Sequence, residues 1–123
     1  MMKDMVLLDT NFLLAPFQFK IDVYEGIQKF GEPMTLDSCV RELGRLEKGQ
    51  TKDSLHAKAS LILLKMKKLK IEKSPYSSDT AIVKYAKRHD CVVATNDRKL
   101  IKRLKSNGIR IIRLRQKKLL MEE

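Results

Sequence analysis

The chain has 123 residues, of which 43% are hydrophobic, so it can form one domain with a hydrophobic core. It contains no Trp, three Tyr and four Phe, which argues against base recognition by a broad aromatic platform. The net charge is +11, and ten Lys or Arg residues without any acid lie between Arg98 and Lys118. This clustering favours a polyanionic partner over a basic face that is merely well solvated.

The cysteines and histidines do not have the spacing of a zinc site. Cys39 and Cys91 lack CxxC or CxxxH neighbours, and His56 and His89 do not complete a zinc pattern. We expect both cysteines to be buried thiols in a reducing compartment. No window of about 18 apolar residues could span a membrane, and the N-terminus lacks the layout of a signal peptide. A cytoplasmic protein without membrane contact is therefore expected.

Short apolar segments bounded by turn or capping residues predict five β-strands, at residues 5–8, 34–36, 70–72, 92–95 and 109–114. Helical spacing and capping residues predict helices at residues 21–29, 38–48, 53–68, 79–88 and 97–107, and a short helical segment after the first strand. Pro16 and residues 17–20 predict a loop. The alternation of strands and helices indicates a parallel sheet. We predict a single α/β domain over residues 1–123: a three-layer sandwich with a central parallel sheet of about five strands, helices on both faces, and a basic tail from about residue 115.

The helix expected at residues 53–68 is apolar on more than one side. One apolar stripe has steps of four and three residues: Leu55, Ala59, Ile62, Met66 and Leu69. Residues 61–64 add a second apolar side. Such a helix either lies in the centre of the fold, which we favour, or forms a homodimer contact.

Acidic residues stand at the ends of two predicted strands and near the starts of two predicted helices: Asp9, Glu42, Asp79 and Asp97. Ligands of open parallel sheets bind beyond the carboxyl ends of the strands, so we expect these carboxylates at one edge of the sheet. Each acid alone also suits a simpler role, as a helix cap, as a turn residue beside Asn11, or as the partner of Arg45. Four carboxylates together would repel one another unless cations hold them.

Mg²⁺ and Mn²⁺ are the cations that prefer oxygen ligands. Two such ions about 3.5–4 Å apart can stabilise both the attacking and the leaving oxygen of a phosphodiester. An acidic site beside a basic surface therefore predicts phosphodiester hydrolysis without a covalent protein intermediate. No Ser-His-Asp or Cys-His set competes with it, because His56 and His89 have no evident partners.

Four short motifs resemble, in order and spacing, the acidic motifs of PIN-domain nucleases. They are LDTN at 8–11, REL at 41–43, SDTAI at 78–82 and ATNDRKL at 94–100. The resemblance covers residues 6–114 and implies a central parallel sheet with helices on both sides. It implies a metal-dependent endoribonuclease with one or two Mg²⁺ or Mn²⁺ ions, whose catalytic metal ligands are Asp9, Glu42, Asp79 and Asp97. Asn11 and Thr95 match site-shaping positions of the family, although Asn11 could only hold a turn and Thr95 only bond to a neighbouring acid.

Three segments resemble stand-alone PIN proteins related to the small-subunit rRNA-processing nuclease more than VapC-type toxins: residues 12–19, 90–98 and 114–118. That resemblance implies rRNA processing or RNA turnover, with structured or ribosomal RNA as the partner. The chain shows no zinc ribbon or added RNA-binding module, which suggests that a protein partner supplies specificity. The alternatives are the toxin nuclease of a VapBC-type toxin–antitoxin pair and a PIN module that binds RNA or the ribosome without cleaving.

The basic C-terminal third supplies the candidate RNA-binding residues: Arg98, Lys99, Lys102, Arg103, Arg113, Arg115, Lys117 and Lys118. The helix that Asp97 opens would join the metal site to the RNA-binding surface, because a helix N-terminus favours phosphate. The basic tail either steers RNA, which we favour, or simply flanks a final strand in water.

Overall fold

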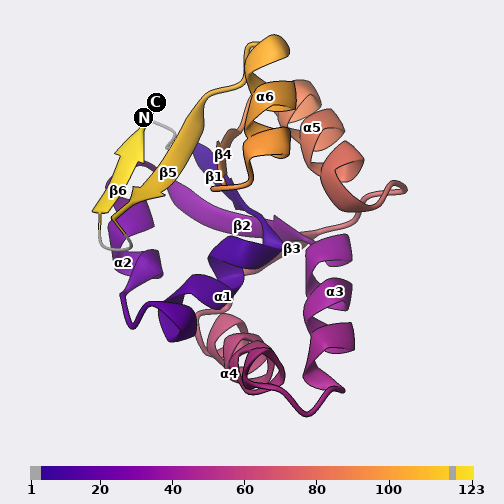
Figure 1. The fold of residues 1–123 in the computed structure, drawn as a ribbon. Helices are drawn as coiled ribbons and strands as arrows, with labels where there is room; N and C mark the ends of the chain where they lie inside the picture. Colours follow the sequence, from indigo (N-terminus) through magenta and orange to yellow (C-terminus); the bar gives the residue numbers. More distant parts are fainter. Residues whose placement is uncertain (1–3, 117–118) are drawn as a thin grey trace.

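The computed structural model describes residues 4–116 and 119–123, apart from the side chains of Ser78 and Leu119 (Figure 1). A single six-stranded sheet runs through the molecule in the order β3-β2-β1-β4-β5-β6. Its strands are β1 (Met5–Leu8), β2 (Glu32–Leu36), β3 (Lys70–Glu72), β4 (Val92–Ala94), β5 (Ile111–Arg115) and β6 (Leu119–Glu122). The first five strands pair in parallel, and β6 pairs antiparallel with β5.

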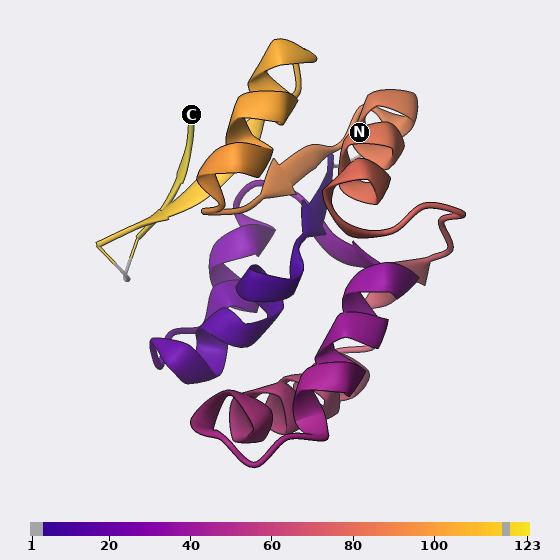
Figure 2. The same cartoon turned by 45° about the vertical axis from the view of Figure 1, so that its right-hand side comes forward.

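Helices lie on both faces of the sheet, so the predicted three-layer α/β fold is confirmed (Figures 1 and 2). They are α1 (Thr10–Gln18), α2 (Val23–Gln28), α3 (Asp37–Glu47), α4 (Lys52–Met66), α5 (Ser78–His89) and α6 (Arg98–Ser106). α5 and α6 pack together on one face, and α1, α2 and α4 lie on the other. None of the helices within the described ranges is long and apolar enough to cross a membrane.

The central strands β1 and β4 are apolar along their length because helices cover both of their faces. Leu7 pairs with Val93 across the two strands, and both side chains are fully buried. Both strands end where an acid follows them within three residues, so this pairing sets the positions of two of the predicted site residues. Cys39 and Cys91 are free and buried, as expected.

α1 extends further than the sequence predicts. It continues through Pro16 to Gln18, where a loop is expected. Proline removes a backbone donor and usually ends a helix. Here residues 12–15 are all buried, and that hydrophobic burial holds the segment in the helix despite the proline.

Residues 119–122, in the predicted basic tail, form the edge strand β6. Leu120 pairs with Leu114 and lies close against Gly26 of α2. The carboxylate of Glu123 forms ion pairs with Arg113 at 3.3 Å and with Arg115. The local sequence did not reveal this strand because its order comes from pairing with β5 and packing against α2.

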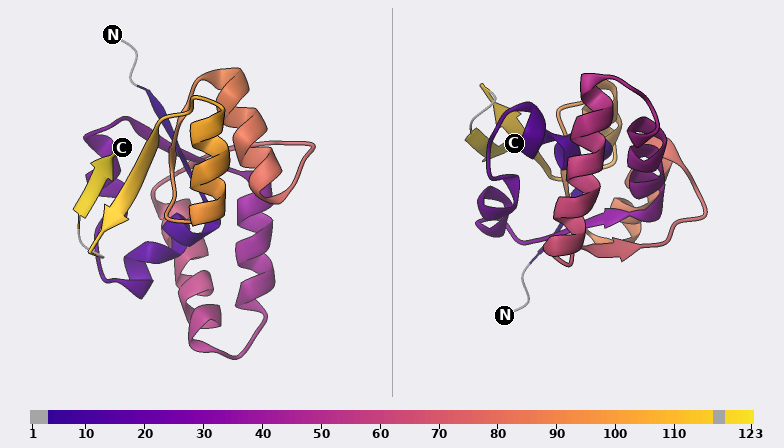
Figure 3. Two further views of the ribbon diagram at one scale, coloured as in Figure 1. Left: turned by 45° about the horizontal axis from the view of Figure 1, so that its top comes forward. Right: turned by 90° about the horizontal axis from the view of Figure 1, so that it is seen from below.

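The prediction that α4 lies in the centre of the fold is wrong. α4 lies at the outside of the molecule (Figure 3), where Leu55 is 69% exposed, Ile62 54% and Met66 74%. The buried side of α4 instead carries mainly small residues, which let it approach α1 and α3 closely: Ser54, Ala57, Ser60 and Leu64. An apolar stripe alone does not say which side of a helix packs. The homodimer contact stays a prediction.

Gly31 lies where the chain enters β2. A Cβ atom added at Gly31 would overlap the carbonyl oxygen of Asp4, which accepts the Glu32 N–H at 2.9 Å. We therefore expect Gly31→Ala to lower the free energy of unfolding by about 1–3 kcal/mol, as overpacking does. Gly44 is the matched control, because a Cβ added there has no heavy atom within 4 Å. Gly44→Ala should raise that free energy by up to about 1 kcal/mol through helix propensity. Urea unfolding that gave both variants the same sign would contradict this prediction.

Candidate active site

Asp9 leaves β1 and points its carboxylate into a cavity at the carboxyl edge of the sheet. It is only 5% exposed. One carboxylate oxygen accepts the Phe12 N–H at 2.8 Å and so caps α1. The other accepts the Thr95 hydroxyl at 2.5 Å. The side chain is thus both a helix cap and a fixed member of the site.

Thr95 links the first and last acidic motifs. Its buried hydroxyl donates to Asp9 and accepts the Asp97 N–H at 3.0 Å. Asp97 in turn caps α6, because its Oδ1 accepts the N–H groups of Lys99 at 2.9 Å and Leu100 at 3.2 Å. The capping role that the sequence offered as the simpler explanation is therefore real, and it coexists with a place in the cavity.

Asp79 and Glu42 reach the same cavity from helices. Asp79 stands in the first turn of α5. Glu42 stands on α3 and accepts the Thr10 hydroxyl at 2.9 Å. Within the described ranges it forms no ion pair with Arg45, the simpler partner that the sequence offered.

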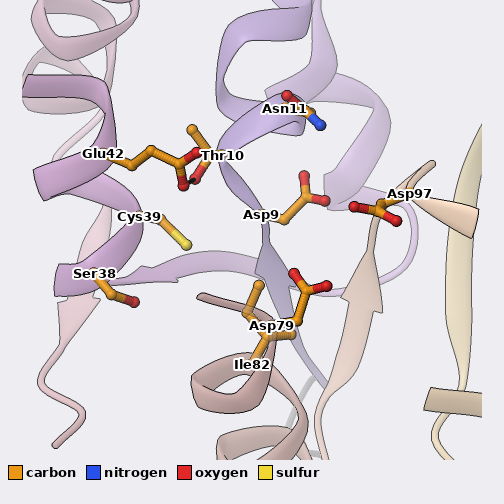
Figure 4. Close-up of a pocket in the computed structure, with 9 residues that line it drawn as sticks. All are labelled: Asp9, Thr10, Asn11, Ser38, Cys39, Glu42, Asp79, Ile82 and Asp97. Atoms are coloured by element: carbon orange, nitrogen blue, oxygen red, sulfur yellow. Dashed lines mark hydrogen bonds between the residues drawn. The ribbon is translucent and has the colours of Figure 1, made fainter. Parts of the chain in front are cut away.

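The cavity holds about 160 Å³ and brings all four predicted acids together. Its lining consists of Asp9, Thr10, Asn11, Ser38, Cys39, Glu42, Asp79, Ile82 and Asp97 (Figure 4). Asp9, Asp79 and Asp97 gather on one side, and Glu42 faces them beside Thr10. No Lys or Arg is among these residues, so the lining itself supplies no positive charge.

Four lining residues were not predicted from the sequence: Thr10, Ser38, Cys39 and Ile82. Spacing could have found three of them, Ser38, Cys39 and Ile82, since residues three or four apart share a helix face. Ser38 lies four residues before Glu42, and Ile82 three after Asp79. The Ser38 hydroxyl is buried and has no hydrogen-bond partner in the part of the chain that the structure describes. This hydroxyl is therefore available to form a hydrogen bond with a ligand or a water molecule.

The electrostatics of the cavity disfavour negative charge. Burial raises the pKa of Asp9 to about 6, although hydrogen bonds from Thr95 and Phe12 oppose this, and the charges of Asp97 and Asp79 raise it further. Burial and the charge of Asp97 also raise the pKa of Asp79, against the opposing effect of Arg103. These carboxylates thus repel one another, which a bound cation would relieve.

The donor set fits a hard divalent cation, because it offers carboxylate and hydroxyl oxygens in one cavity. As the side chains stand, however, the described residues contain no group of three or more His, Cys, Asp or Glu close enough to hold one ion. Glu42 is held by Thr10 instead. Sharing one ion between three of the acids would therefore need side-chain rotation.

A second, more apolar cavity of about 270 Å³ adjoins the acidic cavity, and Asn11 and Asp97 line both. Asn11 is exposed in the first turn of α1. Asn96 also lines this cavity, and its amide exchanges two 2.8 Å hydrogen bonds with the backbone of Leu114. The predicted site-shaping position Asn11 thus stands between the acids and further room for a substrate.

The predicted RNA-binding residues divide into three groups. Arg98, Lys99, Lys102 and Arg103 are exposed on α6, whose other face is buried in the core. Arg113 and Arg115 on β5 are instead paired with Glu123. Lys117 and Lys118 lie outside the described residues. The α6 group is therefore the part of the predicted surface that stands beside the acids.

Comparison with known proteins agrees with this geometry. The sequence model of the PIN-like domain matches residues 6–117. The chain belongs to the PIN-like domain family. Ribonuclease VapC4 of Methanocaldococcus jannaschii is 34% identical over 118 residues, which cover 89% of each chain. Ribonuclease VapC9 of Archaeoglobus fulgidus is 29% identical over 113 residues, or 89% of this chain and 82% of VapC9.

A solved structure of a PIN domain has the same fold. The PIN domain endonuclease Utp24 superimposes with a TM-score of 0.79 and 27% identity, covering 97% of this chain and 90% of that one. The comparisons thus confirm the predicted PIN family and its nuclease class.

Proposed function

We propose that this PIN-like domain is an endoribonuclease that hydrolyses RNA phosphodiester bonds with one or two Mg²⁺ or Mn²⁺ ions. The observation that carries the proposal is the convergence of Asp9, Glu42, Asp79 and Asp97 on one cavity whose lining contains no Lys or Arg. These four residues would hold the ions. When bound, such ions activate water and stabilise the charge that develops on the phosphate.

The residues of the chain contribute position and charge. Thr95 and the Phe12 N–H fix the carboxylate of Asp9, and the N-terminus of α6 fixes that of Asp97. The basic face of α6 attracts backbone phosphates to the acids. Arg103 approaches Asp79 closely enough for its charge to oppose the rise in the pKa of Asp79, so it stands where a phosphate near the acids would meet a positive charge.

Cleavage of an unstructured RNA at pH 7.5 tests this proposal. Mg²⁺ or Mn²⁺ should start cleavage, and excess EDTA should stop it. Manganese binding is followed in parallel by electron paramagnetic resonance. Asp53→Asn on α4 removes a surface charge outside the cavity, so this control variant should bind manganese as the wild type does. No saturable manganese binding would contradict the metal site. Binding of RNA and manganese without cleavage would favour the non-cleaving module.

For the biological role, we favour rRNA processing or RNA turnover in the cytoplasm. The exposed basic face of α6 supports a polyanionic substrate, and we favour a structured or ribosomal RNA. The free, buried thiols of Cys39 and Cys91 suit a reducing compartment. We further propose that a protein partner contributes to the selection of the RNA.

A toxin of a VapBC-type pair is the second candidate, and the similarity to VapC4 and VapC9 favours it. Expression of the protein in a bacterial host would then arrest growth, and coexpression of the small protein encoded beside its gene would relieve the arrest. Normal growth with active nuclease in the cell extract would favour the processing role.

A further inference from the structure

A second groove lies at the β3 edge of the sheet, between β3, the loop after it and α5. It encloses about 500 Å³ and shares no residue with the acidic cavity. Its lining consists of Lys70, Glu72, Lys73, Ser74, Pro75, Tyr76, Lys84, Tyr85, Arg88 and His89. None of these residues was among those predicted from the sequence to bind RNA, because the sequence directs attention to the acid-free run from Arg98 onwards.

The groove combines aromatic rings with accessible surface. Tyr76 is 45% exposed. Tyr85 stacks on His89 with 4.1 Å between the ring centroids. The third tyrosine of the chain, Tyr24, is only 3% exposed, so both accessible tyrosines line this one groove. Two such rings are fewer than a broad platform needs, but each can stack with a base.

Positive charge surrounds these rings. One cation of the groove, Lys70, forms an ion pair with Glu72 at 3.2 Å. Lys73, Lys84 and Arg88 form no ion pair with any described residue. Lys84 Nζ lies 4.6 Å from the centroid of the Tyr76 ring. Because this cation lies over the ring, a base that stacks on Tyr76 takes the opposite face or displaces Lys84 towards its phosphate.

The groove is joined to the acidic cavity through shared scaffold elements. α5 carries Asp79 in its first turn and Arg88 near its end, roughly 14 Å apart at 1.5 Å per residue. The loop that forms the other wall is tied to the start of α3, because Ser74 N–H donates to Asp37 Oδ1 at 3.1 Å. α3 also carries Glu42. The loop runs past the start of α3 before it enters α5 (Figure 1). α5 thus carries residues of both sites, while α3 anchors the loop of the groove and carries Glu42 of the acidic cavity.

We propose that this groove binds a single-stranded segment of RNA that extends from the cleavage site. Bases stack on Tyr76 and on the Tyr85–His89 pair, while Lys73, Lys84 and Arg88 contact phosphates. The strand is single because bases in a duplex are already stacked on one another. The connection to the acids rests on the proposed nuclease function, whereas binding in the groove does not.

The test measures binding without cleavage, by fluorescence anisotropy of a labelled unstructured RNA of about 12 nucleotides in EDTA. Tyr76→Ala together with Tyr85→Ala should raise the Kd for RNA at least about tenfold, because the loss of even one base–ring stack can weaken binding by about that factor. Tyr76→Phe together with Tyr85→Phe should bind within about twofold of wild type, because the rings remain. Circular dichroism checks that each variant is folded.

The exposed cations supply a second, independent pair of variants. Lys84→Ala with Arg88→Ala should weaken binding and lower the magnitude of the salt slope by about one or more. Lys58→Ala with Lys65→Ala on α4 removes the same charge away from the groove, and should leave that slope unchanged. Because Lys84 and Arg88 are exposed, this pair remains informative if the double Tyr→Ala variant does not fold.

The outcomes separate this proposal from the nuclease proposal. RNA binding that depends on the groove, without cleavage in any divalent ion, would keep the groove and overturn the nuclease. Active cleavage with RNA binding unaffected by both groove pairs would overturn the groove. Weaker binding of an acidic polypeptide such as polyglutamate, with RNA binding unchanged, would assign the groove to a protein partner and also overturn the proposal.

Discussion

Asp97→Asn should lower the rate of RNA cleavage by at least about a thousandfold while the protein stays folded. The substitution removes one of the four negative charges that would hold the metal ions. It keeps the helix cap, because the amide oxygen of Asn can still accept the N–H groups of Lys99 and Leu100. The loss of activity would therefore come from the site and not from α6. Single-turnover cleavage in saturating Mn²⁺ measures it.

Asp22 provides the matched control for Asp97. It caps α2 in the same manner, with its Oδ1 accepting the Glu25 N–H at 3.0 Å, and it does not line the acidic cavity. Asp22→Asn should leave the cleavage rate within about twofold of wild type, since it changes a cap alone. If folded Asp97→Asn cut RNA as fast as Asp22→Asn, a metal-holding role for Asp97 would be wrong.

Asp9→Asn should abolish cleavage in the same way and yet stabilise the metal-free protein at pH 7. Burial raises the pKa of Asp9 from 3.8 to about 6, so the folded state binds this proton more tightly than the unfolded state. The resulting stability is fully present below about pH 4 and is lost as the pH rises to about 6. At pH 7 this loss lowers the free energy of unfolding by up to about 3 kcal/mol, compared with pH values below 4. An uncharged Asn avoids this loss and can keep the contact with the Phe12 N–H.

Urea unfolding in EDTA at pH 4 and pH 7.5 measures this effect as a difference between wild type and Asp9→Asn. The difference should be larger at pH 7.5 than at pH 4. Comparing two proteins at each pH removes the contribution of Asp37, whose pKa is lowered because hydrogen bonds from Ser74 and Arg41 outweigh desolvation. Mn²⁺ at pH 7.5 should then stabilise wild type but not the variant. A variant less stable than wild type in EDTA at pH 7.5 would contradict this account.

Substitution of Asp9 and of Asp97 therefore separates function from stability. Repulsion between carboxylates in a partly buried cavity lowers the stability of the metal-free protein. Such destabilising charge clusters are common at ligand-binding sites. Asp9 carries most of this cost because it is the most buried of the four acids. Asp97 is less buried and its charge also caps a helix, so its substitution tests the chemistry with less effect on stability.

The architecture and the chemical class could be predicted from the amino-acid sequence. Apolar runs in β1 and β4, the alternation of strands and helices, and the acids after the strands predicted a parallel α/β fold with one acidic edge. These features are local. A strand that is buried on both faces is a short apolar run, and the alternation of strands and helices is visible in the order of such segments along the chain. The ordered acidic motifs then indicated the PIN family, which the comparisons confirm.

The hydrogen-bond partner of each site residue could not be predicted from the sequence, because it depends on long-range packing. Thr10 holds Glu42 from 32 residues away, and Thr95 holds Asp9 from 86 residues away. Local spacing had suggested Arg45 for Glu42. It also could not say that α4 packs with its small residues, or that residues 119–122 would pair with β5. Those outcomes depend on which surfaces meet when distant segments pack, and the energy of that packing exceeds the local preferences that a sequence pattern records.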